Sequence, residues 1–508
     1  MSDTRPAPPF AVGFGSLAGI GFLVRVWAFL VRGALWNDEA GLGLNIVGRQ
    51  LAEVARPFVY QQYAPYLYVL TTKLLVAVAG PSEHVLRLLS VVAGCMLLPA
   101  MLLLARAASG WSAALFALAL LVPNPTLVRY ASELKPYASD ALIATVLCLL
   151  TLRILQQTQR TRGALLTLAI AGILASWCSL PAVFVLAGCG AALLVDAERN
   201  EWPAVLGLGL VWGVSFVLHY LGFLQASASD SAYVERYWST QDAFAPLVPH
   251  SLAELRWYPA KFFYTFDIFI SPGGRGLRYL AGGLWLWGMF LLWRTQRPLC
   301  VLFVTPWLLL VVASGLHKYI VADRMLLFMV PMVVTPVVVA LAELAQLRGM
   351  QSQLLAAALA VLFCAGPSLT LARSLTAARP RTGIDQVVQY LRKHYRKGDR
   401  LYVEKQVEWI YAFYARRLGF AAPFPIPDDG LYEPTPRFDT LDSLRGSPRA
   451  WVIVPTVSRA APVNELATSW LTRGEALVTT RLNGYGKVVD MLDGDNTHLY
   501  LYDLTQPN

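Results

Sequence analysis

Long apolar runs separated by short polar segments fill the first three quarters of the chain. A helix needs about twenty apolar residues to cross the hydrocarbon core of a membrane, and most of these runs reach or approach that length. The pattern therefore predicts a mainly α-helical, polytopic membrane protein with about eleven transmembrane helices. The predicted spans cover residues 12–32, 85–105, 112–128, 137–154, 164–179, 181–195, 204–224, 277–293, 299–315, 325–342 and 353–372.

One apolar run, residues 63–80, is shorter than most of the others and contains Lys73. We expect it to lie along the membrane surface, because counting it as a span would reverse the orientation of every later helix. The basic residues of the informative loops then fall on the cytoplasmic side, as the positive-inside rule requires. These residues are Arg106, Arg153, Arg160, Arg162, Arg294, Arg297 and Arg348.

This orientation places the N-terminus inside the cell, followed by a first span that we expect to remain uncleaved. Four loops then lie together on the outer face: the one that carries Asp38 and Glu39, and residues 129–136, 225–276 and 317–324. The chain also ends outside. The predicted location is the cytoplasmic (inner) membrane.

From about residue 374 charged residues become frequent and the apolar runs shorten. Residues 386–395 have the spacing of an amphipathic helix, and residues 400–403, 451–454 and 498–504 resemble strands, with a Pro-rich stretch at 423–436. Strands alternating with helices predict a small α/β domain. We therefore expect two domains: a transmembrane domain over residues 1–373 and an extracytoplasmic α/β domain over residues 374–508.

The composition supports this class and excludes others. Of the 508 residues, 56% are hydrophobic and only 15% are charged, and the mean hydropathy is +0.50. The net charge of +10 does not predict nucleic-acid binding, because the basic residues lie in loops between apolar runs. All six cysteines lie in apolar segments, so neither a disulfide framework nor a cysteine metal site is indicated.

Asp38 and Glu39 directly follow the first predicted span. A carboxylate at a membrane boundary loses solvation, and it usually persists where it binds a cation, a sugar or a proton in transit. Partial desolvation should also raise the pKa of Asp38 toward the range of a working base. The alternative is an ordinary charged helix terminus in contact with lipid headgroups.

A second cluster of polar residues lies where two predicted spans meet on the outer side. Residues 129–137 contain Arg129, Glu133, Lys135 and two tyrosines, one of them Tyr137. These groups offer an acceptor for hydroxyl protons, donors for phosphate oxygens and aromatic surface for a sugar ring. The alternative is a belt of anchors at helix ends in which Glu133 pairs with a neighbouring cation.

Two further outer loops carry candidate residues. His317, Lys318, Tyr319 and Arg324 offer cations and donors, and we nominate Lys318 and Arg324 for a phosphate group, although they could equally be helix anchors. The loop 225–276 is rich in aromatic and acidic residues, which suit a carbohydrate as well as an interfacial helix.

Four motifs, in the order given below, resemble those of bacterial polyprenyl-phosphate-dependent glycosyltransferases of the GT-C superfamily. These enzymes are relatives of the protein O-mannosyltransferases and of the lipid A aminoarabinose transferases. The motifs are residues 37–40 (Asn-Asp-Glu-Ala), 64–68 (Ala-Pro-Tyr-Leu-Tyr), 80–90 with Gly80-Pro81-Ser82-Glu83, and 132–137 (Ser-Glu-Leu-Lys-Pro-Tyr). The resemblance covers the N-terminal third closely. The remainder resembles the superfamily in architecture, with a multi-span body and a C-terminal outer domain.

The resemblance implies an inverting transfer of a sugar from a polyprenyl-phosphate donor to an acceptor hydroxyl at the outer face. Asp38 matches the acidic residue that serves as general base, Glu39 is the second choice, and Glu133 is the acidic residue of the second loop. Candidate substrate-binding residues are Tyr63, Tyr66, Arg129, Lys135, Tyr137, His317, Lys318, Tyr319 and Arg324. The acceptor is a glycolipid, a polysaccharide or a protein hydroxyl.

The chain departs from the family pattern at two of these motifs. Lys135 stands where Arg is typical, which keeps the charge but loses the bidentate fork. Tyr63-Ala64-Pro65 stands where many relatives have His-Pro-Pro. No cofactor is indicated with certainty; a divalent metal is possible at the acidic pair, but the motifs lack histidine ligands.

Two other functions remain open from the sequence. A transporter or flippase should show repeat symmetry and ionisable residues near the bilayer midplane, where Arg25 is the one clear charge that we identify. An O-antigen ligase or polymerase also handles lipid-linked sugars, but such proteins usually lack a soluble domain after the spans.

Overall fold

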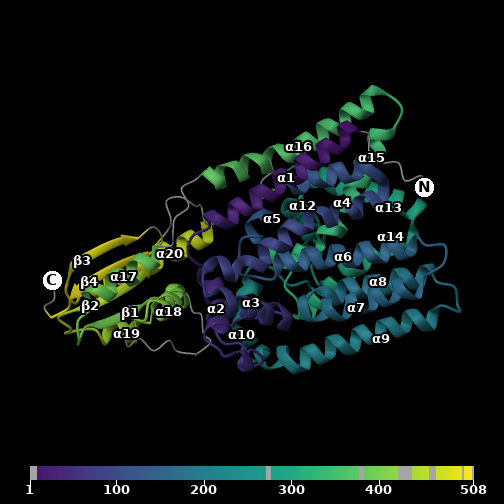
Figure 1. Ribbon diagram of the computed structural model, residues 1–508. Helices are drawn as coiled ribbons and strands as arrows, with labels where there is room; N and C mark the ends of the chain where they lie inside the picture. Colours follow the sequence, from purple (N-terminus) through teal and green to yellow (C-terminus); the bar gives the residue numbers. More distant parts are fainter. Residues whose placement is uncertain are drawn as a thin grey trace.

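A computed structural model of the protein describes residues 8–270, 276–376, 383–420, 437–456, 465–494 and 497–505. A helical body occupies one end of the molecule and a small α/β domain the other, with α2 and α3 between them (Figure 1). The long helices are α1 (Pro8–Val31), α4 (Glu83–Leu121), α6 (Tyr137–Leu155), α7 (Arg162–Cys178), α8 (Ala182–Asp196), α9 (Trp202–His219), α12 (Trp257–Phe269), α13 (Leu277–Thr295), α14 (Arg297–Gly315), α15 (Val330–Gln346) and α16 (Met350–Thr376).

Shorter helices connect these elements. They are α2 (Asn37–Val47), η1 (Leu51–Glu53), α3 (Tyr66–Ala79), α5 (Pro125–Tyr130), η2 (Tyr220–Leu224), η3 (Gln225–Asp230), α10 (Ser231–Thr240), α11 (Leu252–Leu255) and η4 (Asp323–Met329). The helix α3 corresponds to the run that was expected to lie along the membrane surface. At 14 residues it extends about 21 Å, short of the roughly 30 Å hydrocarbon core.

The apolar segments agree with the expected membrane protein. Among the described residues, seven helical stretches are long and apolar enough to cross a membrane: Gly13–Val31, Glu83–Leu121, Tyr137–Leu155, Trp202–Ser227, Arg297–Gly315, Asp323–Gln346 and Met350–Thr376. The expected span 112–128 is wrong at its end, because α4 stops at Leu121 and α5 begins only at Pro125. Asn124 caps α5 by accepting a hydrogen bond from the Leu127 amide.

The helix α4 is a hairpin of two arms. Ser109 and Gly110 have non-helical dihedral angles, and Gly110 has a φ of +83°, which glycine tolerates. A Cβ on Gly21 of α1 would lie 2.7 Å from Leu98 and 2.8 Å from Val122. A straight helix would separate those two residues by about 36 Å, so the chain must reverse between them.

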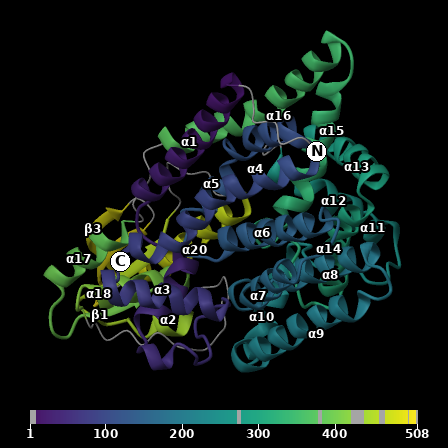
Figure 2. The same ribbon diagram turned by 45° about the vertical axis from the view of Figure 1, so that its right-hand side comes forward.

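Arg25 lies within α1 and is fully buried. Its guanidinium donates hydrogen bonds to the carbonyl oxygens of Gly21 at 3.1 Å and of Leu121 at 3.0 Å. Both acceptors are backbone carbonyls. Arg25 therefore fastens α1 to the second arm of α4. The helices α1 and α16 run side by side along one edge of the body in both views (Figures 1 and 2).

The C-terminal elements form a four-stranded mixed sheet in the order β1-β2-β4-β3. Strands β1 and β2 are parallel, while β4 is antiparallel to both β2 and β3. The elements are α17 (Ile384–His394), β1 (Arg400–Val403), η5 (Lys405–Val407), α18 (Glu408–Arg417), α19 (Phe438–Asp442), β2 (Ala450–Pro455), α20 (Glu465–Asn483), β3 (Lys487–Gly494) and β4 (Thr497–Asp503). The predicted helix and three strands are present, whereas β3, α18 and α20 were not predicted. The Pro-rich stretch 423–436 lies outside the described residues.

One hydrophobic core is shared by the sheet domain and the helices next to it. Leu401, Trp451 and Leu499 on one face of the sheet belong to the same buried cluster as Leu42 of α2 and Tyr68 of α3. The other face of the sheet forms a separate core with α19 and α20. The division into domains at residue 373 remains a prediction, but α2 and α3 pack with the C-terminal domain.

Candidate functional site

Residues from four separate segments meet at the N-terminus of α2. Asp38 lies in the first turn of α2, Gln62 just before α3, Lys135 between α5 and α6, and Arg324 in the first turn of η4. We call these four residues the Asp38 cluster. A carboxylate in the first turn of a helix is favoured by the helix dipole, which helps to hold Asp38 ionised.

The contacts within the Asp38 cluster are short. Lys135 Nζ lies 2.8 Å from Asp38 Oδ1, and Arg324 Nη2 lies 3.1 Å from Asp38 Oδ2. Gln62 joins the pair, since its amide nitrogen donates to Asp38 at 3.2 Å and its amide oxygen accepts from Lys135 at 2.7 Å. One carboxylate is thus held between two cations.

The pKa of Asp38 is lower than expected from the sequence. Burial acts to raise it, but the charges of Lys135 and Arg324 outweigh burial and lower the pKa of Asp38 to about 2. The expectation of a raised pKa is therefore wrong for this structure, because it considered desolvation without the two cations. Asp38 is a fully ionised carboxylate whose basicity is restrained by its partners.

Glu39 lies beside Asp38 but in a different environment. Its two carboxylate oxygens accept hydrogen bonds from Arg87 at 2.8 and 2.7 Å, and both side chains are almost completely buried. The backbone amides of Leu134 and Trp36 donate to the same carboxylate at 2.7 and 3.3 Å. Glu39 therefore ties α2 to α4 and to the segment that carries Lys135.

Glu133 lies next to this network and binds two arginines. Arg32 at the end of α1 and Arg129 at the end of α5 contact its Oε1 at 2.5 and 2.9 Å. Burial acts to raise the pKa of Glu133, but these two cations lower it overall. Its Oε2 is buried and has no hydrogen-bond partner among the described residues.

Aromatic rings surround the guanidinium of Arg324. The ring centroid of Trp36 lies 5.4 Å from its Cζ, and that of Tyr137 lies 5.8 Å away. These cation–π contacts fix the direction of the side chain. The Nε of Arg324 and the Nε1 of Trp36 are buried without a hydrogen-bond partner among the described residues, so each has an unused donor.

The segment from His317 to Arg324 is held at both ends. His317 and Asp323 have φ values of 56° and 26°, a region that costs free energy for residues other than glycine. His317 contacts Glu235 at 2.6 Å and stacks on Phe244, and Asp323 accepts a hydrogen bond from the Tyr264 hydroxyl.

The remaining nominated residues have different surroundings. Lys318 is exposed, and none of the ion pairs of the described chain includes it. Tyr319 donates to the carbonyl of Met325 at 2.7 Å and packs on Phe184, so it supports the start of η4. Tyr66 stacks on Phe223 with ring centroids 4.1 Å apart, whereas Tyr63 is 38% exposed. The structure thus brings Arg324, but not Lys318, into contact with Asp38.

Several residues of the site were not found from the sequence. Gln62 gives no motif signal, whereas Arg87 lies within the motif at residues 80–90 and Trp36 directly precedes the motif at residues 37–40, but neither was nominated. Each acts through a contact across the fold. Asp140 did carry a signal, since it lies inside the predicted span 137–154. It is 94% buried, and its Oδ1 has no hydrogen-bond partner among the described residues.

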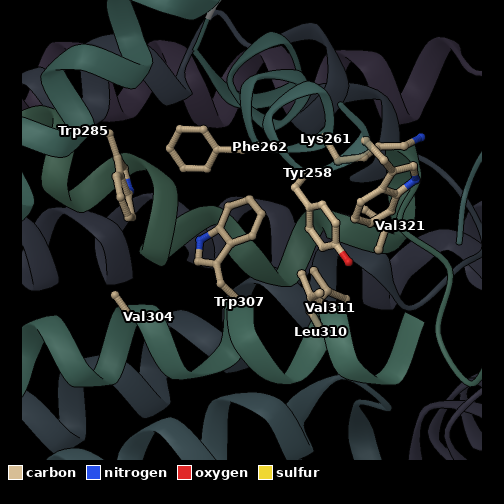
Figure 3. Close-up of a pocket in the computed structure, with 10 residues that line it drawn as sticks. Tyr258, Lys261, Phe262, Trp285, Val304, Trp307, Leu310, Val311 and Val321 are labelled. Atoms are coloured by element: carbon tan, nitrogen blue, oxygen red, sulfur yellow. The ribbon is translucent and has the colours of Figure 1, made fainter. Parts of the chain in front are cut away.

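A largely apolar cavity of about 260 Å³ lies between α12, α13 and α14. Phe262, Trp285, Trp307 and Tyr258 surround it with their rings (Figure 3). Val321 also lines the cavity, and it belongs to the same loop as Arg324, three positions away. Lys261 at its edge has a lowered pKa because of burial.

The described residues contain no group of three or more His, Cys, Asp or Glu side chains that could hold a metal ion. The oxygens of Asp38 contact Lys135 and Arg324, and those of Glu39 contact Arg87. These residues therefore do not fit a divalent metal in the present arrangement.

The chain gives no match to a protein-family model and no significant match to a curated protein sequence. It is similar to solved structures of ArnT from Cupriavidus metallidurans. The structure bound to undecaprenyl phosphate has a TM-score of 0.58 at 14% identity, over 97% of this chain and 98% of that chain. The apo structure has a TM-score of 0.57 at 14% identity, over 98% of both chains.

A further match is the Archaeoglobus fulgidus oligosaccharyltransferase in complex with zinc and sulfate, with a TM-score of 0.48 at 12% identity, over 82% of this chain and 58% of that chain. The ArnT matches cover nearly the whole length of both chains. The expected fold, a multi-span helical body with a small C-terminal sheet, is therefore confirmed, and it is similar to that of ArnT.

Proposed function

We propose that the protein is an inverting glycosyltransferase that moves a sugar from a polyprenyl-phosphate donor to an acceptor hydroxyl, at the outer face of the cytoplasmic membrane. The observation that carries this proposal is the contact of the Asp38 carboxylate with both Lys135 and Arg324. A base and two cations at one point are the groups that a reaction with a phosphate leaving group requires. The similarity in fold to a protein solved with undecaprenyl phosphate supports it.

The donor phosphate binds Lys135 and Arg324 through N–H groups that Asp38 does not use. Lys135 has three donors, two of which contact Asp38 and Gln62, and Arg324 has an unpartnered Nε. The phosphate charge then neutralises the cations, so the pKa of Asp38 rises when the donor is bound. The two cations therefore keep the pKa of Asp38 low in the enzyme without donor, and this effect weakens when the donor is bound.

In the reaction, Asp38 accepts the proton of the acceptor hydroxyl. The acceptor oxygen forms a bond to the anomeric carbon from the opposite side as the bond to the phosphate oxygen breaks. The electron pair of that bond leaves with the polyprenyl phosphate, where Lys135 and Arg324 stabilise the added negative charge. A single displacement inverts the anomeric centre and needs no second carboxylate nucleophile.

The aromatic cavity suits the isoprenoid chain of the donor. Its lining is largely apolar, and Val321, which lines it, lies three residues before Arg324, so we place the phosphate end of a lipid bound there at the cations. Burial of apolar lipid surface stabilises the complex by about 25 cal/mol per Å². The sugar is a hexose or a pentose, and the acceptor is a glycolipid, a polysaccharide or a protein.

A transporter or flippase gains no support from the described residues. Arg25 is bonded to backbone carbonyls within the helical body, as a structural residue is. The polar network gathers instead at the end of the body that faces the C-terminal domain, where α2 lies (Figure 1).

The test is transfer of radiolabelled sugar from a panel of polyprenyl-phosphate sugars in proteoliposomes. Asp38→Asn should lower the rate by about 10²- to 10⁴-fold, the usual contribution of a general base, while binding of undecaprenyl phosphate persists. Glu53→Gln, at an exposed ion pair, is the matched control. A fully active Asp38→Asn enzyme, or a wild-type enzyme that consumes no donor of the panel, would overturn the proposal. Full activity in a chelator would exclude a required metal.

A further inference from the structure

The helix α18 of the C-terminal domain packs directly on α2. Ile410, Phe413 and Tyr414 of α18 share a buried cluster with Leu42 and Ile46 of α2. A Cβ on Gly43 would lie 3.1 Å from the Phe413 ring, and one on Gly41 would lie 3.0 Å from Trp409. The glycines therefore allow a close approach of the two helices. The catalytic candidate Asp38 begins a helix whose outer surface is covered by another domain.

Tyr414 makes a specific polar contact at this interface. The backbone amide of Leu35 donates to its hydroxyl at 3.0 Å, and that hydroxyl donates to Glu83 Oε1 at 2.9 Å. Arg417, one turn further along α18, contacts the same Glu83 oxygen at 2.6 Å. Leu35 lies three residues before Asp38, and Glu83 begins α4. The hydroxyl thus joins α18, the entry to α2 and the start of α4.

The contact lies at one end of a buried framework. Arg87, one turn after Glu83 on α4, binds Glu39 and also donates to the carbonyl oxygens of Gly33 at 2.7 Å and Ala34 at 3.2 Å. The backbone before α2 is therefore fixed by Arg87 through its carbonyls and by Tyr414 through its amide. Neither Tyr414 nor Arg87 contacts the Asp38 carboxylate.

We propose that α18 positions the general base, so that the C-terminal domain is part of the catalytic apparatus and Tyr414 is a positioning residue. This inference rests on the proposed function. The contact fixes the place of Asp38 relative to the anomeric carbon, whereas donor binding depends on Lys135, Arg324 and the cavity. Loss of the contact should therefore affect the chemical step more than donor binding.

The chain offers a closely matched control for this test. Tyr411 lies one turn before Tyr414 on α18 and is equally buried, at 3% exposure each, but its hydroxyl has no hydrogen-bond partner among the described residues. Tyr414→Phe and Tyr411→Phe remove the same atom from the same helix. Only the first substitution removes the contact with Leu35 and Glu83.

The full-length variants should be compared in lipid nanodiscs by hydrogen exchange of the amides of residues 35–47 and by steady-state kinetics. In Tyr414→Phe we expect faster exchange, with Leu35 the most affected, and a kcat lower by about 10- to 100-fold. The KM for the donor and the affinity for undecaprenyl phosphate should stay within about twofold. Tyr411→Phe should match the wild type in all readouts.

A milder variant guards against misfolding. Arg417→Gln removes the ion pair with Glu83 but keeps the Leu35 contact, and it should give a smaller change in the same direction. Equal exchange and equal kcat in Tyr414→Phe and Tyr411→Phe would overturn the inference, as would a loss of donor affinity as large as the loss of kcat. Hydrogen exchange tests the contact between α18 and the segment before α2 without any sugar transfer. If the wild type transfers no sugar, the proposed function fails, but the exchange data still test this contact.

Discussion

Lys135 and Asp38, which lie 97 positions apart in the chain, are joined by a contact of 2.8 Å between Nζ and Oδ1. Both side chains are largely buried, and Gln62 bridges them. The residues around the pair come from different segments of the sequence. Its geometry determines when the carboxylate can act as a base, and this leads to predictions for pH, binding and stability.

The pH dependence of the reaction should change when Lys135 is removed. In the wild type the two cations lower the pKa of Asp38 from 3.8 to about 2, so the carboxylate is ionised above that pH, and the stability from its ion pairs is lost as the pH falls through about 2. In Lys135→Met, burial is opposed only by Arg324 and the weaker hydrogen bond from Gln62, so the pKa of Asp38 rises. The acidic limb of kcat/KM, which reports the free enzyme, should then move to higher pH.

The measurement is the pH profile of kcat/KM between about pH 4 and about pH 8, where the wild type should show no acidic limb and Lys135→Met should show one. Lys261→Met, which removes a half-buried lysine outside the Asp38 cluster, is the control and should have the flat acidic side of the wild type. A profile of Lys135→Met as flat as that of the wild type would contradict the assignment of Asp38 as the base.

Replacement of Arg324 by lysine should weaken donor binding even though the charge is kept. Lysine loses the planar fork and the contacts with Trp36 and Tyr137. A hydrogen bond to a charged group contributes about 1.5–3 kcal/mol, which corresponds to an affinity for undecaprenyl phosphate lower by about 10- to 100-fold. Isothermal titration in detergent measures this, with Arg297→Lys as control, because Arg297 begins α14 whereas the segment that carries Arg324 follows the end of that helix. Wild-type affinity in Arg324→Lys would exclude Arg324 from the phosphate site.

Glu39→Gln and Asp38→Asn should differ in the balance between lost stability and lost transfer. Glu39→Gln leaves the buried Arg87 without its charged partner, which costs about 3–5 kcal/mol of folding free energy and lowers Tm. Because Glu39 also belongs to the framework next to Asp38, the folded fraction should lose part of its transfer activity. Asp38→Asn removes the ion pairs with Lys135 and Arg324, which also lowers Tm, but it should lose transfer far more completely. If Glu39→Gln kept its Tm and lost all activity, Glu39 would be the better candidate for the base.

The sheet domain should lose stability as the pH rises. His498 lies between Glu475 at 2.5 Å and Asp493 at 2.9 Å, and the hydrogen bond to Glu475 raises the pKa of His498 despite burial. The folded state therefore favours the protonated ring. The stabilisation is complete below about pH 6.5 and is lost as the pH rises through the higher folded value.

Thermal unfolding of the sheet domain, followed between about pH 5 and about pH 9, measures this effect. His498→Gln should have a flatter dependence of Tm on pH than the wild type. Equal pH dependence in the two proteins would show that the two carboxylates do not stabilise the charged ring.

Much of the helical body could be predicted because lipid imposes a simple rule of length and polarity on a span. The two spans on either side of residue 110 appear as the arms of α4, and the reversal lies at the pair Ser109-Gly110. By contrast, α18 was missed because it is apolar on more than one side. Trp409 and Phe413 face α2, while Ile410 and Tyr411 are buried with them, so no single stripe marks the helix. The edge strand β3 is mostly exposed and lacks clear alternation.

The candidate site could be predicted as a set of motifs but not as an arrangement. Asp38, Lys135 and Arg324 were nominated because charged residues at membrane boundaries are expensive. Glu39 is bound by Arg87, and Arg324 rather than Lys318 contacts Asp38. These contacts depend on distances in the folded protein, which cannot be read from the spacing of residues along the chain. The pKa of Asp38 was misjudged for the same reason.

The amide of Leu35 finds its partner 379 residues later, in Tyr414. The segment that carries Asp38 is translated early, yet its packing is completed only after Tyr414 has been made. A chain that stops before α18 has all the helices of the body but lacks the contact of Tyr414 with Leu35 and Glu83. Under the proposed role of α18, the site around Asp38 is complete only after this helix has been made.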